Sequence, residues 1–221
     1  MTQPPLEPSD RNPIRVLITA GPTREPIDPV RFISNASSGR QGVALAECAL
    51  KRGWQVDFVH GPLEVEVPRG IDAHAVTTTA EMLEACRRRH PDCDALIGAA
   101  AVSDFRPQAI ADRKQKRGFE TWLLQLTPTT DILAKLGELK GDRVHVGFAL
   151  ESEDLELNAN RKLERKNLDW IVANEPAAIG AQEARYLLLG KNGFREDLGS
   201  LTKEALAERI VAQIARDLTA V

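Results

Sequence analysis

The residues best suited to bind a charged ligand lie in one long loop, residues 21–42, with the sequence GPTREPIDPVRFISNASSGRQG. A short apolar run, residues 15–20, comes before this loop, and an Ala-rich amphipathic segment, residues 43–51, comes after it. This order predicts a strand, a loop and a helix. Three prolines in the loop argue against regular structure there. The loop is also longer than the roughly 2 to 6 residues of an ordinary connection in an α/β unit, which favours a binding site.

The end of this loop predicts an anion site at the start of the helix. Ser37, Gly39 and Gly42 supply a hydroxyl and free backbone amides there, and glycines let a phosphate approach the main chain. The partial positive charge of a helix N-terminus acts in the same direction. The alternative is that Ser37 or Ser38 serves only as an N-cap and Gly39 only as a turn residue.

A second candidate loop follows a buried apolar segment. Residues 94–101 predict a strand, and residues 99–107, AAAVSDFRP, have small side chains that let a ligand lie against the backbone. Asp104 either accepts hydrogen bonds from a ribose or base, or caps the local turn. Residues 111–118, ADRKQKRG, then form a cationic run. This run is either a solvated loop or part of a mobile flap, residues 108–119, that closes over a triphosphate.

Short β-branched runs alternate with helical segments, which predicts a Rossmann-like, doubly wound α/β fold with a mostly parallel sheet, flanking helices and a small β-hairpin extension. Phe148, near the end of one expected strand, is either a core side chain or a base-stacking platform. Lys162 and Lys166 share one face of a charged helix, whose ordinary environment is solvent. The expected strands are 15–20, 54–60, 74–76, 94–101, 121–126, 144–150 and 168–174; the hairpin is 186–196 and further helices are 79–89, 132–139 and 201–218.

Composition limits the class of protein. With 221 residues, 43% of them hydrophobic and 28% charged, the chain is long enough for one large α/β domain that buries a core. A net charge of -3 gives no indication of nucleic-acid or membrane binding. Three cysteines without metal-ligand spacing indicate reduced thiols and a cytoplasmic protein. Residues 1–12 are expected to be a disordered tail, followed by a single domain, residues 13–221.

Four motifs together resemble those of the phosphopantothenoylcysteine synthetase family. They are the loop 21–42, AAAVSDFRP, VGFALES and RKLERKNLDWIVAN, in this order. The resemblance covers nearly the whole chain from residue 15, and the first motif is long and unusual. It implies a ligase of coenzyme A biosynthesis that joins L-cysteine to 4'-phosphopantothenate through an acyl-nucleotide, with release of pyrophosphate and CMP. The implied co-substrate is CTP, with ATP as the alternative, and Mg²⁺ is the implied cofactor.

The resemblance also implies roles for single residues. Lys114 is expected to stabilise formation of the acyl-nucleotide, and Asn35 to bind the intermediate and aid its conversion. Arg31 is expected to hold the substrate phosphate across the interface of a homodimer. The expected nucleotide-binding residues are Ser37, Gly39, Gly42, Gly98, Ala99, Ala100, Asp104, Lys114, Thr130, Asp131, Ile132, Leu133, Phe148, Lys162 and Lys166; the expected substrate-binding residues are Arg31, Asn35, Ala100, Ala101 and Asp104.

Magnesium is expected to be held by nucleotide phosphates and water rather than by protein side chains. Many bacterial members are fused behind a flavin-dependent decarboxylase; this chain has no room for one, so it resembles the stand-alone synthetase or an isolated synthetase domain. Whether a phosphopantothenoylcysteine decarboxylase is fused to it or binds as a separate partner stays open. The chain departs from the family at Pro128-Thr129-Thr130, where many bacterial members have Lys-Asn-Pro. One lysine that could reach the triphosphate is therefore missing.

A second class of protein shares the first strand, the Gly-rich turn and the Ala-rich helix, namely the NAD(P)-dependent oxidoreductases of the Rossmann type. Two features count against this alternative. The glycines do not have the G-x-G-x-x-G spacing, and the second expected strand ends in Val59-His60-Gly61, without an acidic residue for the ribose hydroxyls.

Overall fold

The computed structural model describes residues 13–118, 121–175 and 183–219, so the predicted tail, residues 1–12, lies outside the described residues. Its helices are α1 (Arg40–Lys51), α2 (Thr79–Arg89), α3 (Ile132–Gly137), α4 (Leu155–Arg165) and α5 (Lys203–Thr219). Its strands are β1 (Arg15–Ala20), β2 (Arg24–Pro26), β3 (Phe32–Ser34), β4 (Gln55–His60), β5 (Asp72–Ala75), β6 (Ala95–Gly98), β7 (Phe105–Pro107), β8 (Leu126–Pro128), β9 (Val144–Leu150), β10 (Trp170–Asn174), β11 (Glu183–Gly190) and β12 (Phe194–Thr202).

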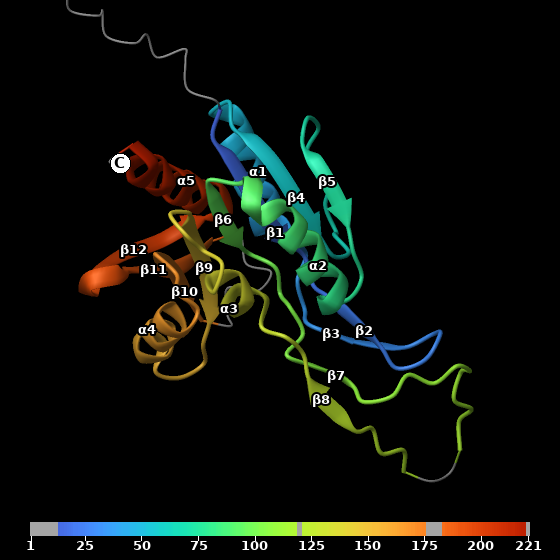
Figure 1. Ribbon diagram of the computed structural model, residues 1–221. Coiled ribbons are helices and arrows are strands. Elements are labelled where there is room, and N and C mark those ends of the chain that lie inside the picture. The colour runs from blue at the N-terminus through green and yellow to red at the C-terminus, as the bar shows by residue number, and fades with distance from the viewer. Residues whose placement is uncertain (1–12, 119–120, 176–182, 220–221) are drawn as a thin grey trace, which may run out of the picture.

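The centre of the molecule is an eight-stranded sheet with the order β12-β11-β10-β9-β6-β1-β4-β5 (Figure 1). The strands from β10 to β5 in this order are parallel, whereas β11 and β12 pair antiparallel at the edge. The predicted Rossmann-like fold with a mostly parallel sheet is therefore confirmed. The predicted hairpin is present, but it is longer than expected and forms part of the main sheet.

Helices cover both faces of this sheet. Side chains of a buried strand alternate between the two faces, so each face presents apolar residues that a helix can cover. Val16 and Ile18 of β1 face a core that includes residues of α1 and α5, whereas Leu17 faces a core that includes residues of α2 and α3. Residues of α4 pack with β10 and β11 in a third cluster. The result is a three-layer arrangement in which the strand ends remain open for a site.

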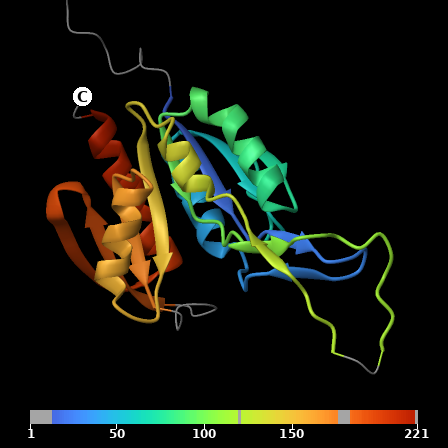
Figure 2. The ribbon, with the colours of Figure 1, turned by 60° about the horizontal axis from the view of Figure 1, so that its bottom comes forward.

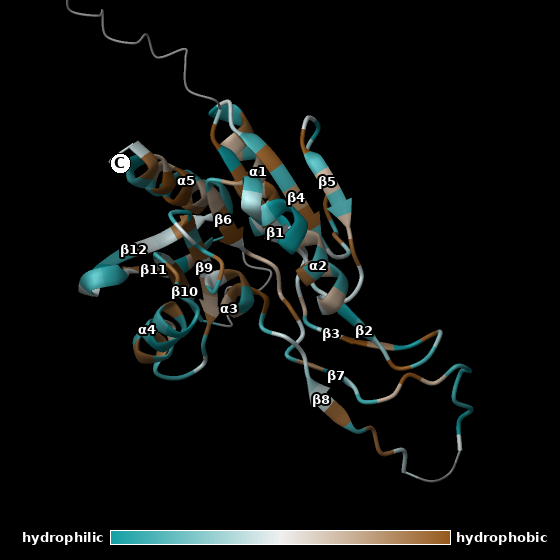
Figure 3. Ribbon diagram, viewed as in Figure 1, coloured by the Kyte–Doolittle hydropathy of each residue, from teal (hydrophilic) through white to brown (hydrophobic). Residues whose placement is uncertain are grey.

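An arm of two short antiparallel pairs, β2–β3 and β7–β8, projects from the main sheet (Figure 2). The prediction that prolines exclude regular structure from residues 21–42 is thus wrong for this hairpin. Pro26 is the last residue of β2 and pairs with Phe32, so its missing N–H costs little. The arm includes several hydrophobic residues (Figure 3). Several of their side chains are exposed, and Leu123 has an exposed fraction of 85%.

The largest difference in element boundaries also falls on the arm. The expected strand 121–126 is absent as such, and β8 begins only at Leu126. The alternating pattern of residues 121–126 wrongly predicted a strand there. The side chains of residues 121–124 are exposed, so this segment has no buried face. Elsewhere the expected boundaries of buried elements agree closely with the structure: α2 and β9 occupy the expected residues.

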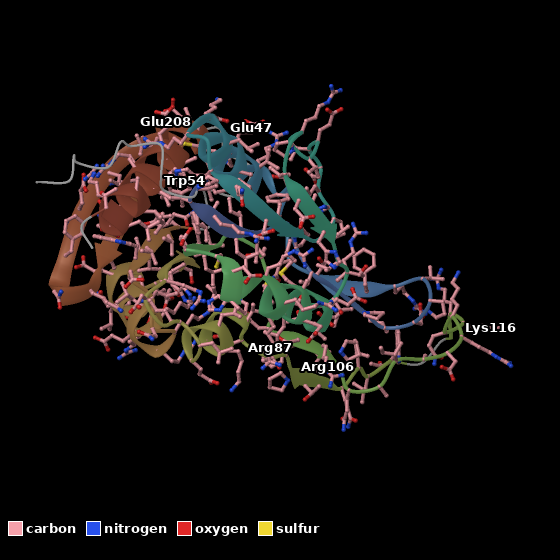
Figure 4. All side chains as sticks on the ribbon, turned by 45° about the horizontal axis from the view of Figure 1, so that its top comes forward. Glu47, Trp54, Arg87, Arg106, Lys116 and Glu208 are labelled. Atoms are coloured by element: carbon pink, nitrogen blue, oxygen red, sulfur yellow. The ribbon has the colours of Figure 1, made fainter. Side chains whose placement is uncertain are left out.

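Helix α1 lies very close to β1 at Gly42, where an added Cβ would come within 2.3 Å of the Ala20 Cβ. Gly42→Ala is expected to lower the free energy of unfolding by about 1 to 3 kcal/mol, because overpacking outweighs the better helix propensity of alanine. Equilibrium denaturant unfolding measures this change. Glu47→Ala on the exposed face of α1 (Figure 4) is the control and is expected to change it by less than about 0.5 kcal/mol. Undiminished stability of Gly42→Ala would contradict this account of the contact.

Candidate active site

A cleft of about 490 Å³ opens at the carboxyl ends of β1, β6 and β9. This is the edge of an open parallel sheet at which ligands bind. The predicted residues that line the cleft are Asn35, Gly98, Ala100, Ala101, Asp104, Thr130, Asp131, Ile132, Leu133, Phe148, Lys162 and Lys166. A separate hollow of about 570 Å³, next to β11, β12 and the start of α4, contains none of the predicted residues.

Asn35 connects the two loops that the sequence singled out. Its side-chain Nδ2 donates a hydrogen bond to the backbone oxygen of Val102 at 2.9 Å and lies 3.5 Å from that of Ala101. Its Oδ1 accepts no hydrogen bond within the described residues. One N–H of Nδ2 is therefore engaged by the Val102 oxygen, and the second N–H, which has only the long contact with the Ala101 oxygen, is the donor that a ligand carbonyl can use.

Asp104 presents a free carboxylate to the cleft. Its backbone oxygen accepts a hydrogen bond from the amide of Thr129 at 2.9 Å, but within the described residues its exposed side chain makes neither a hydrogen bond nor an ion pair. The alternative that this carboxylate caps the local turn is therefore wrong. It is available to accept hydrogen bonds from hydroxyl or amine groups of a ligand.

Two lysines line the cleft, each placed by a carboxylate. Lys162 Nζ lies 2.6 Å from Glu151 Oε1, and Lys166 Nζ lies 3.1 Å from Asp131 Oδ2. Asp131 also caps α3, because its Oδ1 accepts from the backbone amide of Ala134 at 3.1 Å. The alternative of an ordinary solvated helix face is wrong here: the two ammonium groups are partly buried and supply positive charge to the cleft.

Phe148 packs as a core side chain and also lines the cleft, while its role as a base-stacking platform remains a prediction. It is half-buried, packs against the core and lines the cleft. Gly98 also has a packing role, because a Cβ at this position would come within 2.6 Å of a methyl carbon of Leu133. A side chain at position 98 would therefore disturb the wall of the cleft that Leu133 forms.

The N-terminus of α1 is capped by a different residue from the one that the sequence suggested. Gly39, with φ of 78°, is the N-cap residue, and no side chain caps the helix, so the alternative that Ser37 or Ser38 is the N-cap is wrong. Gly39 needs this left-handed backbone conformation, which favours glycine. Ser37 Oγ accepts from the Gly39 amide at 3.4 Å. The free amides of the first helical turn are consistent with anion binding, but Ser37 and Gly39 lie beside the cleft rather than in its lining.

Two other expected nucleotide-binding residues have a packing role in the structure. Gly42 is buried against β1, as its contact with Ala20 shows. Ala99 packs against the core on the α1 face of the sheet, and its backbone amide donates to the Thr19 oxygen at 3.2 Å. Neither residue lines the cleft, because each packs against the α1 side of the sheet instead. A contact of either residue with nucleotide remains a prediction.

Arg31 and Lys114 lie on the arm rather than in the cleft. Lys114 is exposed and is part of the flap, of which residues 108–118 are described; Figure 4 shows the nearby Lys116 at the far end of the arm. Arg31 forms an ion pair with Asp28. Burial raises the pKa of the Asp28 carboxyl. Hydrogen bonds from Arg31, Val30 and Gln115 lower it by a larger amount, so the pKa is well below its usual range.

Sequence reasoning missed several residues of the cleft and its surroundings. Glu151 is part of the VGFALES motif, but only the folded chain shows that its carboxylate meets Lys162. Arg165 was hidden among other charged residues, and its guanidinium lies 3.4 Å from Asp131. The cleft residues that were missed are Thr19, Ala36, Val102, Thr129, Leu150 and Arg165.

Lys166→Gln is expected to weaken binding of a nucleoside triphosphate about tenfold or more, because a hydrogen bond to a charged group contributes roughly 1.5 to 3 kcal/mol. Lys166 is a cleaner test than Lys162, since Asp131 retains Arg165 as a second partner. Isothermal titration calorimetry with CTP and with ATP measures the change. Lys135→Gln is the control, because Lys135 pairs with Glu138 outside the cleft. Equal affinity of the wild type and Lys166→Gln would remove Lys166 from the nucleotide site.

Across the described ranges, no group of three or more His, Cys, Asp or Glu side chains could hold a metal ion. Two carboxylates line the cleft: Asp131 already meets two cations, and Asp104 has no side-chain partner among the described residues. This donor set fits an ion that brings its own phosphate and water ligands better than an ion in a protein cage. None of the described helices has the length and apolar character that a membrane span requires.

Comparison with known proteins identifies the class of protein to which this fold and cleft belong. Residues 12–218 match the family model described as the DNA/pantothenate metabolism flavoprotein C-terminal domain. The chain belongs to this family. The resemblance of its motifs to the phosphopantothenoylcysteine synthetase family is confirmed.

Individual relatives agree with this assignment. The chain is 44% identical over 220 residues to a cysteine/cysteine sulfinic acid decarboxylase from an unknown prokaryotic organism, covering 97% of this chain and 60% of that protein. It is 41% identical over 205 residues to the coenzyme A biosynthesis bifunctional protein CoaBC of Bacillus subtilis (strain 168), covering 90% of this chain and 50% of that protein. The chain thus spans 50% to 60% of the length of these two relatives.

A solved structure of similar length resembles the whole fold. The crystal structure of the C-terminal domain of the coenzyme A biosynthesis bifunctional protein CoaBC is 38% identical, with a TM-score of 0.83. The match covers 94% of this chain and 97% of that chain. The architecture described here is therefore that of a CoaBC C-terminal domain.

Proposed function

We propose that this chain is a phosphopantothenate–cysteine ligase of coenzyme A biosynthesis. The observation that carries the proposal is the cleft itself: it joins Asn35, Asp104 and the lysine pair, which come from motifs far apart in the sequence. The names of the CoaBC relatives, which place those proteins in coenzyme A biosynthesis, support the same activity.

The first step activates a carboxylate. The carboxylate oxygen of 4'-phosphopantothenate attacks the α-phosphate of the nucleoside triphosphate, and the bond to the leaving pyrophosphate breaks. Negative charge accumulates because one anion attacks another, so a nearby cation lowers the barrier. Lys114 supplies this cation. Because Lys114 lies on the arm in this structure, the step requires the flap to close onto the cleft that holds the nucleotide. Lys162 and Lys166 hold the phosphates or base within the cleft.

The second step forms the amide. The amine of L-cysteine attacks the activated carbonyl, the acyl–phosphate bond breaks, the nucleoside monophosphate leaves and the amine loses a proton. Asn35 is well suited to this step because an amide donates hydrogen bonds without titrating, and its contact with the Val102 oxygen holds it in place beforehand. Asp104 accepts hydrogen bonds on the nucleotide or pantothenate side.

Magnesium would neutralise phosphate charge when bound with the triphosphate. The cleft presents too few free carboxylates to enclose such an ion, so phosphates and water are its proposed ligands. We assign CTP as the co-substrate on the family resemblance alone. ATP is the alternative, since Pro128-Thr129-Thr130, of which Thr129 and Thr130 line the cleft, stands where many bacterial members have Lys-Asn-Pro.

Two partners belong to the proposal. The first is a second copy of this chain: Arg31 does not line its own cleft, and we assign it to the substrate phosphate in the cleft of a neighbouring subunit. The exposed apolar residues of the arm suit such an interface. The second is a phosphopantothenoylcysteine decarboxylase, because the bifunctional CoaBC relatives extend beyond the length that this chain spans.

The test is an assay of the purified protein with 4'-phosphopantothenate, magnesium and either CTP or ATP, first without and then with L-cysteine. The expected result is CTP-dependent release of pyrophosphate, with CMP and amide after cysteine is added. Equal activity with ATP would retain the ligase and revise the base preference. Neither pyrophosphate nor amide with either nucleotide, from folded protein, would refute the proposed function.

A further inference from the structure

A buried carboxylate ties the two halves of the arm together. Asp28, in the turn between β2 and β3, has an exposed fraction of only 3%. Its Oδ1 accepts hydrogen bonds from the backbone amides of Val30 and Arg31, both at 2.9 Å. Its Oδ2 accepts from Arg31 Nε at 2.9 Å and from the backbone amide of Gln115 at 3.2 Å. One carboxylate therefore shapes the turn with one oxygen and holds the flap with the other.

Arg31 makes a second connection between the same segments. Its Nη2 donates to the backbone oxygen of Gln115 at 3.0 Å, and its guanidinium lies over the ring of Trp122, 4.6 Å from the ring centroid. The amide of Ala111 also donates to the Ile27 oxygen at 3.0 Å. We call the group formed by Asp28, Arg31, Gln115 and Trp122 the arm latch.

Packing alone does not account for this latch. None of the three core clusters includes residues of the arm turn, 27–31, and several apolar side chains around it are exposed. An acid buried in this setting is retained at a desolvation cost, which its charge-assisted hydrogen bonds offset. What these bonds achieve is a defined position for the flap, and Gln115 directly follows Lys114.

We propose that Asp28 is a positioning residue for the reaction: through the arm latch it holds Arg31 and the flap that carries Lys114 as one unit. The inference rests on the proposed function for the roles of Arg31 and Lys114. Arg31 uses Nε and Nη2 in the latch, while Nη1 has no hydrogen bond within the described residues. A substrate phosphate can therefore bind Nη1 while the latch stays intact, so that binding of the phosphate places the neighbouring lysine at the same time.

The latch is tested first without any substrate, by limited trypsin digestion of the folded full-length protein. Trypsin cleaves after the basic residues of the flap, Arg113, Lys114, Lys116 and Arg117, and the initial rate tracks the population in which the flap is released. Asp28→Asn retains an oxygen for the turn amides but places an NH₂ group where Arg31 and Gln115 donate. It is expected to raise the initial rate of flap cleavage on the order of tenfold.

Two further variants make this result specific. Arg31→Met leaves the turn hydrogen bonds of Asp28 in place and is expected to raise flap cleavage as Asp28→Asn does, even if the latter fails to fold. Asp197→Asn is the matched control, because it removes an ion pair of 2.6 Å with Arg185 in the hairpin at the sheet edge. It is expected to leave flap cleavage unchanged. Equal cleavage rates in the wild type, Asp28→Asn and Arg31→Met would overturn the latch.

The positioning role is tested with 4'-phosphopantothenate, magnesium and CTP. Asp28→Asn is expected to slow single-turnover release of pyrophosphate on the order of tenfold with unchanged affinity for CTP, because the latch lies outside the cleft. Faster flap cleavage combined with an unchanged rate of pyrophosphate release would overturn the positioning role. If the wild type releases no pyrophosphate at all, the proposed function fails, whereas the digestion experiment still decides whether the latch exists.

Discussion

Lys114→Gln is expected to slow formation of the acyl-nucleotide roughly 30- to 1,000-fold, which corresponds to about 2 to 4 kcal/mol of activation free energy. Glutamine keeps much of the length and polarity of lysine but removes the charge that opposes the negative charge of the transition state. Single-turnover release of pyrophosphate, measured with enzyme in excess over 4'-phosphopantothenate, isolates this step. Affinity for CTP is expected to change little, since Lys114 lies outside the lining of the cleft.

The control for this prediction is Lys116→Gln. Lys116 has the same charge and exposure and lies two residues further along the flap, but the family resemblance gives it no catalytic role. Its replacement is expected to change the rate less than about threefold, the size of a distant screened charge effect. An unchanged single-turnover rate in Lys114→Gln, or equal losses in both variants, would remove the specific role of Lys114.

Asn35→Ala is expected to separate the two half-reactions. Pyrophosphate release is expected to continue, up to about one equivalent per site, whereas amide formation falls roughly 100- to 1,000-fold, the scale of removing one oxyanion donor. The physical reason is that the donor at Asn35 Nδ2 matters most when the carbonyl oxygen gains charge under attack by the cysteine amine. Rapid-quench analysis of pyrophosphate and of amide in the same reaction measures both steps.

Asn35→Asp is the matched variant for this experiment, because it preserves shape but replaces the donor by an acceptor. It is expected to lose amide formation as fully as Asn35→Ala and, in addition, to repel the anionic substrates. Since Nδ2 also donates to the Val102 oxygen, thermal unfolding of both variants shows whether the contact between the loops matters for stability. Equal losses in pyrophosphate release and amide formation by Asn35→Ala would contradict the assignment to the second step.

The sequence predicted the central sheet well because its inner strands, β1, β4, β6, β9 and β10, are largely buried. Residues 144–150 and 79–89 were predicted with the boundaries that β9 and α2 have, since apolar periodicity and polar ends coincide there. The arm was predicted poorly. Its hairpin β2–β3 contains proline and lacks a buried face, so neither propensity nor periodicity indicates the pairing.

The candidate site shows the same division. Motifs identified the loops at the ends of β1, β6 and β9, because such loops are long and rich in small residues. They did not distinguish residues that line the cleft from neighbours one position away. Ala99 and Ala100 are equivalent in composition, yet only Ala100 lines the cleft, whereas Ala99 packs against the core on the α1 face of the sheet. Both residues follow the end of β6 at Gly98, so the course of the folded loop decides which way each one points.

By itself, then, the sequence determined the class of fold, the family and most of the residues at the carboxyl ends of the strands, since these follow from local pattern and from long motifs. Only the tertiary structure decided which charges meet. The pairs Lys162–Glu151 and Lys166–Asp131 join residues from different elements, and the latch of Asp28 joins segments 87 residues apart. The physical reason is that hydrogen bonds and ion pairs depend on distances of a few ångströms, which a parallel sheet with crossover helices sets between residues remote in the chain.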